Sequence, residues 1–244
     1  GRVEFALLAM DQILTQAAKW DYMFGGGYPC RFSARMNIGR QWGNGPQHTS
    51  SYNSLFANTP GISVLWPSRP SEAYQFTRYM HTTMSPALHM EHRWLFKTTD
   101  VIDEAHDSNY LQTAAIYGDC SDIVILTYGD SLVEALKVKK AITDRNISIV
   151  CLTAFCGDRS LPAAVVRAVS RAKELFVLDS SNYEYGLLQG AVGNLAVQDV
   201  LPAKVKVFAP PFIPVATAAK LVQEYYPVCP TVVEFMHSTG MTKV

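Results

Sequence analysis

The strongest constraint on the fold is a series of short apolar, β-branched runs in the second half of the chain, each followed by helical periodicity. After Asp122, the residues up to Tyr128 form a continuous β-branched run that ends at Gly129, and buried-strand patterns also occur at residues 147–152, 174–178 and 205–208. Strands that are apolar throughout are buried on both faces, which is typical of parallel strands covered by helices. We therefore predict an α/β fold with parallel sheets and right-handed crossovers.

The first half of the chain shows the same alternation in a shorter form. Strand patterns lie at residues 31–36, 62–66 and 87–91, and helical patterns lie at residues 5–23, at 51–58 and from Ser71 onward. Residues 97–121 instead carry several acidic side chains and few regularly spaced apolar residues, which indicates a connecting segment. We predict two parallel-sheet domains, residues 1–96 and 122–244, joined by a linker at residues 97–121.

Composition restricts the classes of function. The 21 basic and 21 acidic residues cancel, and only 17% of residues are charged, which argues against a nucleic-acid-binding protein. No apolar run is long enough for a membrane span, and the first residues lack a signal-peptide layout. The 5 cysteines form no C-x-x-C pair, which argues against a zinc ribbon or a disulfide scaffold. We expect a protein of the cytoplasm.

His48 is the one candidate site residue that the residues alone indicate. It follows a glycine-rich loop, residues 37–46, and stands at the entry to a helical segment. Loops at strand ends of open α/β sheets are where ligands bind, and glycine lets backbone approach a ligand closely. A histidine that only faces solvent is the alternative. The common nucleotide-binding glycine motifs are absent, and no metal site is predicted, since His89 and His92 would point to opposite faces of a strand.

Several motifs follow one another in the order in which one known family has them. They are FALLAMDQI at residues 5–13, GPQH at 45–48, PGISV at 60–64, PSRPSEA at 67–73, MEHRWLF at 90–96, DIVILTYG at 122–129 and PPFIPV at 210–215. Together they resemble the beta subunit of the thiamine-diphosphate-dependent 2-oxo acid dehydrogenase first component. The resemblance implies a pyrimidine-binding transketolase-like domain in residues 1–96 and a transketolase C-terminal domain in residues 122–244.

The family resemblance implies oxidative decarboxylation of a 2-oxo acid, with acyl transfer to lipoamide, by two kinds of subunit. A partner alpha subunit would hold magnesium and the diphosphate of thiamine diphosphate, while the beta subunit receives the aminopyrimidine ring. Phe5 matches the aromatic residue packed near that ring, with ordinary core packing as the alternative. His48 matches the active-site histidine that assists acyl transfer, a role that suits a pKa near working pH. The implied partners are the alpha subunit, in an α2β2 heterotetramer, and the lipoyl acyltransferase component.

Two other interpretations stay open. In the family, the glutamate that pairs with the pyrimidine ring lies upstream of the segment that matches residues 3–5, so its position is expected before Gly1, and the first domain is expected to lack its opening strands. This favours, as an alternative, a non-catalytic assembly subunit or remnant of the same family. The C-terminal half of a two-part transketolase is a further alternative. The mitochondrial matrix is the alternative to the cytoplasm.

Overall fold

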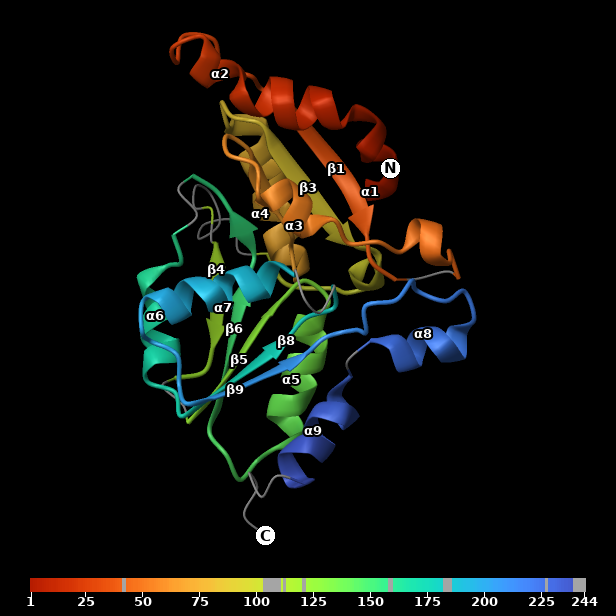
Figure 1. Ribbon diagram of the computed structural model, residues 1–244, viewed down its shortest axis with the longest axis vertical. Helices are drawn as coiled ribbons and strands as arrows, with labels where there is room; N and C mark the ends of the chain where they lie inside the picture. The colour runs from red at the N-terminus through yellow and green to blue at the C-terminus, as the bar shows by residue number, and fades with distance from the viewer. Residues whose placement is uncertain are drawn as a thin grey trace. The chain divides into compact units, whose positions relative to one another are not determined.

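The computed structural model describes residues 1–40, 43–102, 111, 113–119, 122–157, 160–181, 186–226 and 228–238 (Figure 1). The chain divides into unit 1, residues 1–113 with 153–160, and unit 2, residues 114–152 with 161–244. Each unit contains one mostly parallel sheet, so the predicted α/β fold is confirmed. Part of the predicted linker, residues 103–110, 112 and 120–121, lies outside the described residues. Its residues 114–117 form a strand of unit 2.

Unit 1 is built around a sheet with the strand order β1-β3-β2-β7. The strands are β1 (Ser33–Ile38), β2 (Ser63–Leu65), β3 (Ala87–His92) and β7 (Ala154–Phe155). β1 and β2 run parallel to β3, whereas β7 runs antiparallel to β2. All residues of β2 and β3 are buried, while β1 at the edge mixes exposed and buried positions. The first three strands fall where the sequence predicted them, and β7 was not predicted.

The helical segments of unit 1 are short except for one. The first run comprises α1 (Val3–Ala6), η1 (Leu7–Ala9), η2 (Asp11–Gln16), η3 (Ala17–Lys19) and α2 (Trp20–Met23), so the predicted helix at residues 5–23 is a series of α, 3₁₀ and π turns. The others are η4 (Pro46–His48), α3 (Asn53–Ala57), α4 (Pro70–Thr82) and η5 (Arg93–Leu95). Glu72 accepts hydrogen bonds from the Ser68 and Arg69 N–H groups at 2.7 and 3.2 Å, which satisfies donors where α4 begins.

Gly61 allows the backbone before β2 to lie against the first helical run. Its φ is +88°, and a Cβ at this position would lie 1.8 Å from the Ala18 carbonyl oxygen. We expect Gly61→Ala to lower the free energy of unfolding by about 2 kcal/mol, because the backbone must move and the φ angle disfavours a side chain. Urea unfolding followed by circular dichroism measures the change.

The matched control is Gly190→Ala. No atom lies within 4 Å of a Cβ added at Gly190, and this residue lies within a helix, where alanine is favoured over glycine. We therefore expect the control to unfold at the same urea concentration as the unchanged chain or at a higher one. A Gly61→Ala variant that matched this control would contradict the close approach to Ala18.

Unit 2 is built around a sheet with the strand order β4-β6-β5-β8-β9. The strands are β4 (Ala114–Tyr117), β5 (Ile123–Tyr128), β6 (Ile147–Leu152), β8 (Glu174–Leu178) and β9 (Lys204–Phe208). All pairs are parallel except β4 with β6. The four predicted strands are present, and every residue of β5, β6 and β8 is buried, as their apolar runs require. β4 was not predicted because it lies in the segment interpreted as a linker.

Helices cover both faces of the unit 2 sheet. The helices of unit 2 are α5 (Ser131–Ala141), α6 (Ala163–Ser170), α7 (Leu187–Val197), α8 (Ala219–Tyr225) and α9 (Cys229–Ser238), and α8 has no buried residue. Odd-numbered residues of β5 and β6, such as Ile125 and Ile149, share a core with residues of α5 and α9, so the alternating even-numbered residues of these two strands face the other side, where Figure 1 shows α6 and α7. None of the helices in the described part of the chain has the length and apolarity needed to cross a membrane.

Candidate active site

The predicted site residue His48 lies in the loop that follows the carboxyl end of β1 in unit 1. The chain turns at Gly39, where φ is +71° and a Cβ would lie 3.1 Å from the Nδ1 atom of His92 at the end of β3. The Gly39 N–H donates to the Ser50 carbonyl at 3.3 Å and closes the base of the loop. Residues 41–42 of this loop lie outside the described residues. The loop therefore stands at the carboxyl edge of a parallel sheet, the usual place for ligands in open α/β sheets.

The structure brings the two predicted site residues together. The ring centroids of Phe5 and His48 are 5.5 Å apart, with the ring planes inclined by 34°. The Phe5 side chain is 58% exposed, so it is not the core residue that the alternative interpretation required. The Nδ1 atom of His48 is buried and has no hydrogen-bond partner among the described residues. An exposed aromatic face next to an imidazole offers packing for a flat ring and a group that can carry a proton.

A charged cluster that sequence reasoning missed lies beside these two rings. The Glu4 carboxylate accepts the Ser50 N–H at 2.8 Å, just beyond His48. The Arg2 Nε atom lies 3.2 Å from Glu4, and its Nη2 atom donates to the Gly39 carbonyl at 3.3 Å. Both side chains are about nine-tenths buried, with 9% and 11% exposed. The signal available in the sequence was an acidic residue directly before Phe5.

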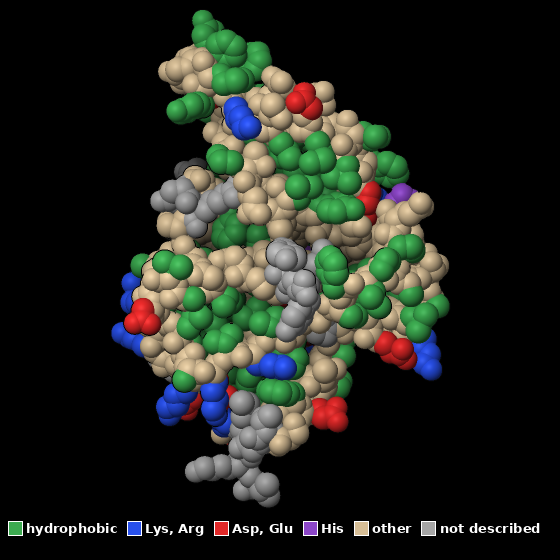
Figure 2. All heavy atoms as spheres, viewed as in Figure 1, with side chains coloured by type: hydrophobic (Ala, Val, Ile, Leu, Met, Phe, Trp, Pro, Cys, Tyr) green, Lys and Arg blue, Asp and Glu red, His purple; other side chains and the backbone are tan. Residues whose placement is uncertain are grey.

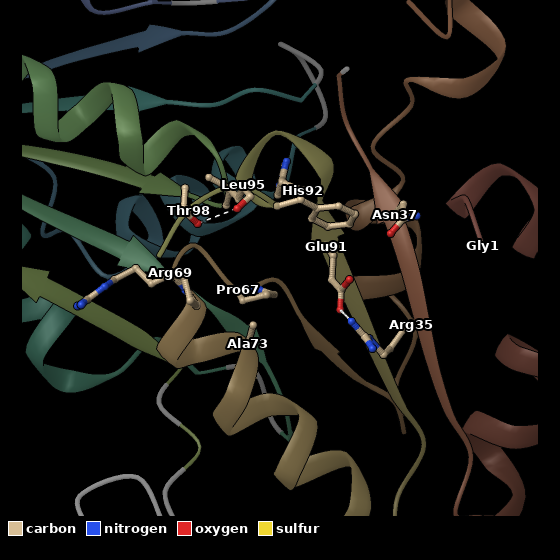
Figure 3. A pocket seen from close by; sticks show the side chains of 12 residues that line it. Gly1, Arg35, Asn37, Pro67, Arg69, Ala73, Glu91, His92, Leu95 and Thr98 are labelled. Carbon is tan, nitrogen blue, oxygen red and sulfur yellow. Dashed lines mark hydrogen bonds and ion pairs between the residues drawn. The ribbon is translucent and has the colours of Figure 1, made fainter. Parts of the chain in front are cut away.

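A cavity of about 620 Å³ opens near the carboxyl ends of β1 and β3 (Figure 3). Its wall comes from these strands, from the start of α4 and from the segment after β3, and consists of Gly1, Arg35, Asn37, Pro67, Arg69, Pro70, Ala73, Glu91, His92, Leu95, Phe96 and Thr98. Phe5 and His48 are not among the residues that line it. The volume is within the range of small-molecule sites. No motif of the sequence predicts this cavity.

The charges on the cavity wall are paired. The Arg35 Nη2 atom lies 2.6 Å from Glu91 Oε1, and Figure 3 shows the two side chains pointing toward each other. Arg69 pairs with Asp100 at 2.6 Å. The Nδ1 atom of the fully buried His89 lies 3.3 Å from the same Glu91 oxygen. Burial lowers the pKa of His89 to about 3, helped by the Arg35 charge, so this imidazole is neutral near pH 7 and Arg35 balances Glu91.

The described residues include no group of three or more histidine, cysteine or acidic side chains placed to hold a metal ion. His89 packs edge-on against Phe76, with ring centroids 6.0 Å apart, inside unit 1. Its surroundings are therefore those of a packed core histidine.

Comparison with known proteins finds no matching family model. The chain is 25% identical over 227 residues to the acetoin:2,6-dichlorophenolindophenol oxidoreductase subunit beta of Cupriavidus necator, covering 92% of this chain and 67% of that protein. It is 25% identical to the 2-oxoisovalerate dehydrogenase subunit beta of Bacillus subtilis, and this match covers 95% of this chain and 72% of that protein. It is also 25% identical to the mitochondrial pyruvate dehydrogenase E1 component subunit beta-1 of Arabidopsis thaliana, and this match covers 89% of this chain and 61% of that protein. The chain thus spans about two thirds of the length of these relatives.

The fold is similar to a solved structure described as a split gene transketolase, inactive beta4 tetramer. The TM-score is 0.75 at 13% identity, and the match covers 100% of this chain and 75% of that one. At this identity the likeness shows the fold alone, and it confirms the transketolase-like expectation. The sequence relatives are beta subunits of dehydrogenases and of an acetoin oxidoreductase, which confirms the resemblance that the motifs carried and does not favour a two-part transketolase.

Proposed function

We propose that this chain is the beta subunit of a thiamine-diphosphate-dependent 2-oxo acid dehydrogenase, because its relatives are beta subunits of 2-oxo acid dehydrogenases and of an acetoin oxidoreductase. The proposed reaction is oxidative decarboxylation of a 2-oxo acid with acyl transfer to lipoamide. The observation that carries the proposal is the contact between Phe5 and His48 at the carboxyl edge of the unit 1 sheet. The resemblance assigned these residues separately, and they are distant in sequence.

The residues at this contact fit the aminopyrimidine ring of the cofactor. Phe5 keeps much of its ring exposed and would pack against a flat ring, in the way that aromatic rings stack. When bound, thiamine diphosphate supplies the stabilisation of the carbanion left by decarboxylation. His48 would hold a proton for the acyl-transfer step, and we assign this to its Nε2 atom because Nδ1 is buried.

A partner alpha subunit completes the proposed site. It would hold magnesium and the cofactor diphosphate, and an α2β2 heterotetramer and a lipoyl acyltransferase component follow from the same proposal. An exposed apolar tip on unit 1 offers surface of the kind that partners cover, and Figure 2 shows it at the top of the view. Its large exposed side chains are Trp20, Tyr22, Met23, Phe24 and Tyr28. The proposed location is the cytoplasm or the mitochondrial matrix, since the relatives include bacterial and mitochondrial proteins.

Binding of thiamine diphosphate and magnesium to the chain together with its alpha partner tests the proposal by calorimetry. We expect Phe5→Ala to weaken binding roughly 10- to 100-fold, because burying a phenylalanine side chain contributes about 1.5–3 kcal/mol. Phe212→Ala is the matched control, since Phe212 is another exposed phenylalanine and lies in unit 2.

The outcomes separate the enzyme from the non-catalytic remnant. If the unchanged complex binds no cofactor, the proposed function is wrong and the remnant is favoured. If the complex binds the cofactor and Phe5→Ala binds it equally well, the assignment of Phe5 is wrong while the enzyme assignment stands.

A further inference from the structure

One carboxylate joins the loop that carries His48 to the segment that carries Phe5. Glu4 directly precedes Phe5, and its Oε1 atom accepts the Ser50 N–H at 2.8 Å. Ser50 also accepts the Gly39 N–H through its carbonyl at 3.3 Å, so both polar groups of its peptide backbone are engaged where the loop closes. This contact therefore links Glu4, which precedes Phe5, to the backbone of Ser50, which lies two residues after His48.

Arg2 holds the Glu4 carboxylate in place. Its Nε and Nη2 atoms lie 3.2 and 3.4 Å from the two carboxylate oxygens, and Nη2 also reaches the carbonyl of Gly39 at 3.3 Å. The pair is about nine-tenths buried, where charge-assisted contacts are stronger than in water. Arg2 thus contacts both the carboxylate and the first residue of the loop, so the three groups form one connected network.

A second explanation for Glu4 is neutralisation of buried arginines. Burial lowers the pKa of Arg93, the nearby Arg2 charge lowers it further, and Glu4 raises it. The distances favour a role in placing the loop, because the shortest polar contact of the carboxylate is the one to Ser50. The His48 ring has no hydrogen bond of its own among the described residues at Nδ1, so its place depends on the loop backbone and on Phe5.

We infer that Glu4 is a positioning residue, which holds the His48 imidazole against Phe5 by anchoring the loop at Ser50. The inference rests on the proposed function for its consequence in catalysis. Its structural part concerns only the contacts within unit 1. Misplacement of a catalytic group by about 1 Å can lower a rate on the order of 10²-fold, so a loosened loop would reduce turnover without touching the substrate.

Two substitutions separate loop anchoring from charge neutralisation. Glu4→Gln keeps a side chain of the same length and an oxygen that can accept the Ser50 N–H, but it removes the charge. Glu4→Asp keeps the charge near Arg2 and Arg93 but withdraws the carboxylate from Ser50 by one methylene. Anchoring predicts that the glutamine variant keeps the loop in place through the Ser50 contact even though it loses the ion pair with Arg2, and that the aspartate variant does not. Neutralisation predicts the reverse.

The readout is the ring-current shift that Phe5 imposes on the His48 ring protons, measured by NMR in the full chain against Phe5→Leu. We expect Glu4→Gln to retain most of this shift and Glu4→Asp to lose most of it. With the alpha partner, we expect lipoyl-dependent turnover to fall roughly 10- to 100-fold in Glu4→Asp and to stay near normal in Glu4→Gln. Glu224→Gln, on α8 of unit 2, is the control and should change neither quantity.

The inference is overturned if Glu4→Asp keeps the Phe5-dependent shift, or if Glu4→Gln loses it or fails to fold. Because the shift is measured on the chain without cofactor, this result does not depend on whether the chain is an enzyme subunit. An unchanged complex that lacks activity would contradict the proposed function and leave the NMR result intact.

Discussion

Replacing His48 by glutamine should abolish most lipoyl-dependent turnover while leaving the subunits assembled. We expect a loss of about 10²- to 10⁴-fold, the usual contribution of a positioned acid–base group. The half-buried His48 lies at the end of the η4 turn and contacts Phe5, and substituting it removes no hydrogen bond that the described residues make with Nδ1. Gel filtration of the complex with its alpha partner checks assembly, and a steady-state assay with lipoyl acceptor protein checks turnover.

An artificial electron acceptor sharpens the test, because it bypasses acyl transfer to lipoamide. We expect His48→Gln to lose much less activity with such an acceptor than with the lipoyl protein. His81→Gln is the matched control, since His81 is an exposed histidine in the last turn of α4. Equal losses with both acceptors would contradict a role in acyl transfer, and full activity with the lipoyl protein would remove His48 from the site altogether.

The parallel core of each sheet could be predicted from the sequence because burial on both faces leaves an apolar run. β5, β6 and β8 are buried throughout, and their largely apolar, β-branched segments predict them. The antiparallel edges could not be predicted. β7 has only two residues, Ala154 and Phe155, and β4 is partly exposed, so neither carries a pattern that differs from that of a loop. Their pairing is decided by neighbours that are distant in the sequence.

Part of the candidate site could be predicted because motif order identified Phe5 and His48. Their contact could not be predicted, since it depends on the turn at Gly39 and on the anchor at Ser50. The Arg2–Glu4 pair was missed for a related reason: charged side chains are expected to face solvent until their burial is known. The cavity of unit 1 is formed by four separate segments, and no single stretch of sequence indicates it.

Unit 2 contains a buried carboxyl group whose cost to stability depends on pH. Asp179 follows β8 and is fully buried, and its Oδ1 atom accepts hydrogen bonds from the N–H and hydroxyl of Ser181 at 2.7 and 2.6 Å. Burial raises the pKa of Asp179 to about 6, with the hydrogen bonds to Ser181 opposing the rise and the nearby Asp130 charge adding to it. The folded chain therefore favours the protonated acid more than the unfolded chain does.

This pKa shift sets the sign of a pH dependence. Because the pKa of Asp179 is raised in the folded chain, its contribution to stability is greatest at acidic pH, is lost as pH rises from about 4 to about 6, and stays lost above that. A pKa shift of this size corresponds to a contribution to the free energy of unfolding on the order of 3 kcal/mol. Asp179→Asn mimics the protonated acid, so we expect it to match the unchanged chain near pH 4 and to exceed its free energy of unfolding near pH 7.

Urea unfolding between pH 4 and pH 8 measures this difference, and Asp122→Asn is the control with the opposite sign. The Asp122 side chain is 46% exposed and pairs with Lys173 at 2.9 Å, and its hydrogen bond and attraction to Lys173 lower its pKa. We expect that variant to be only slightly less stable than the unchanged chain near pH 7, because exposed ion pairs contribute little. If Asp179→Asn gained nothing between pH 4 and pH 7, the Asp179 carboxyl would have to be stabilised as an anion, which burial beside Asp130 opposes.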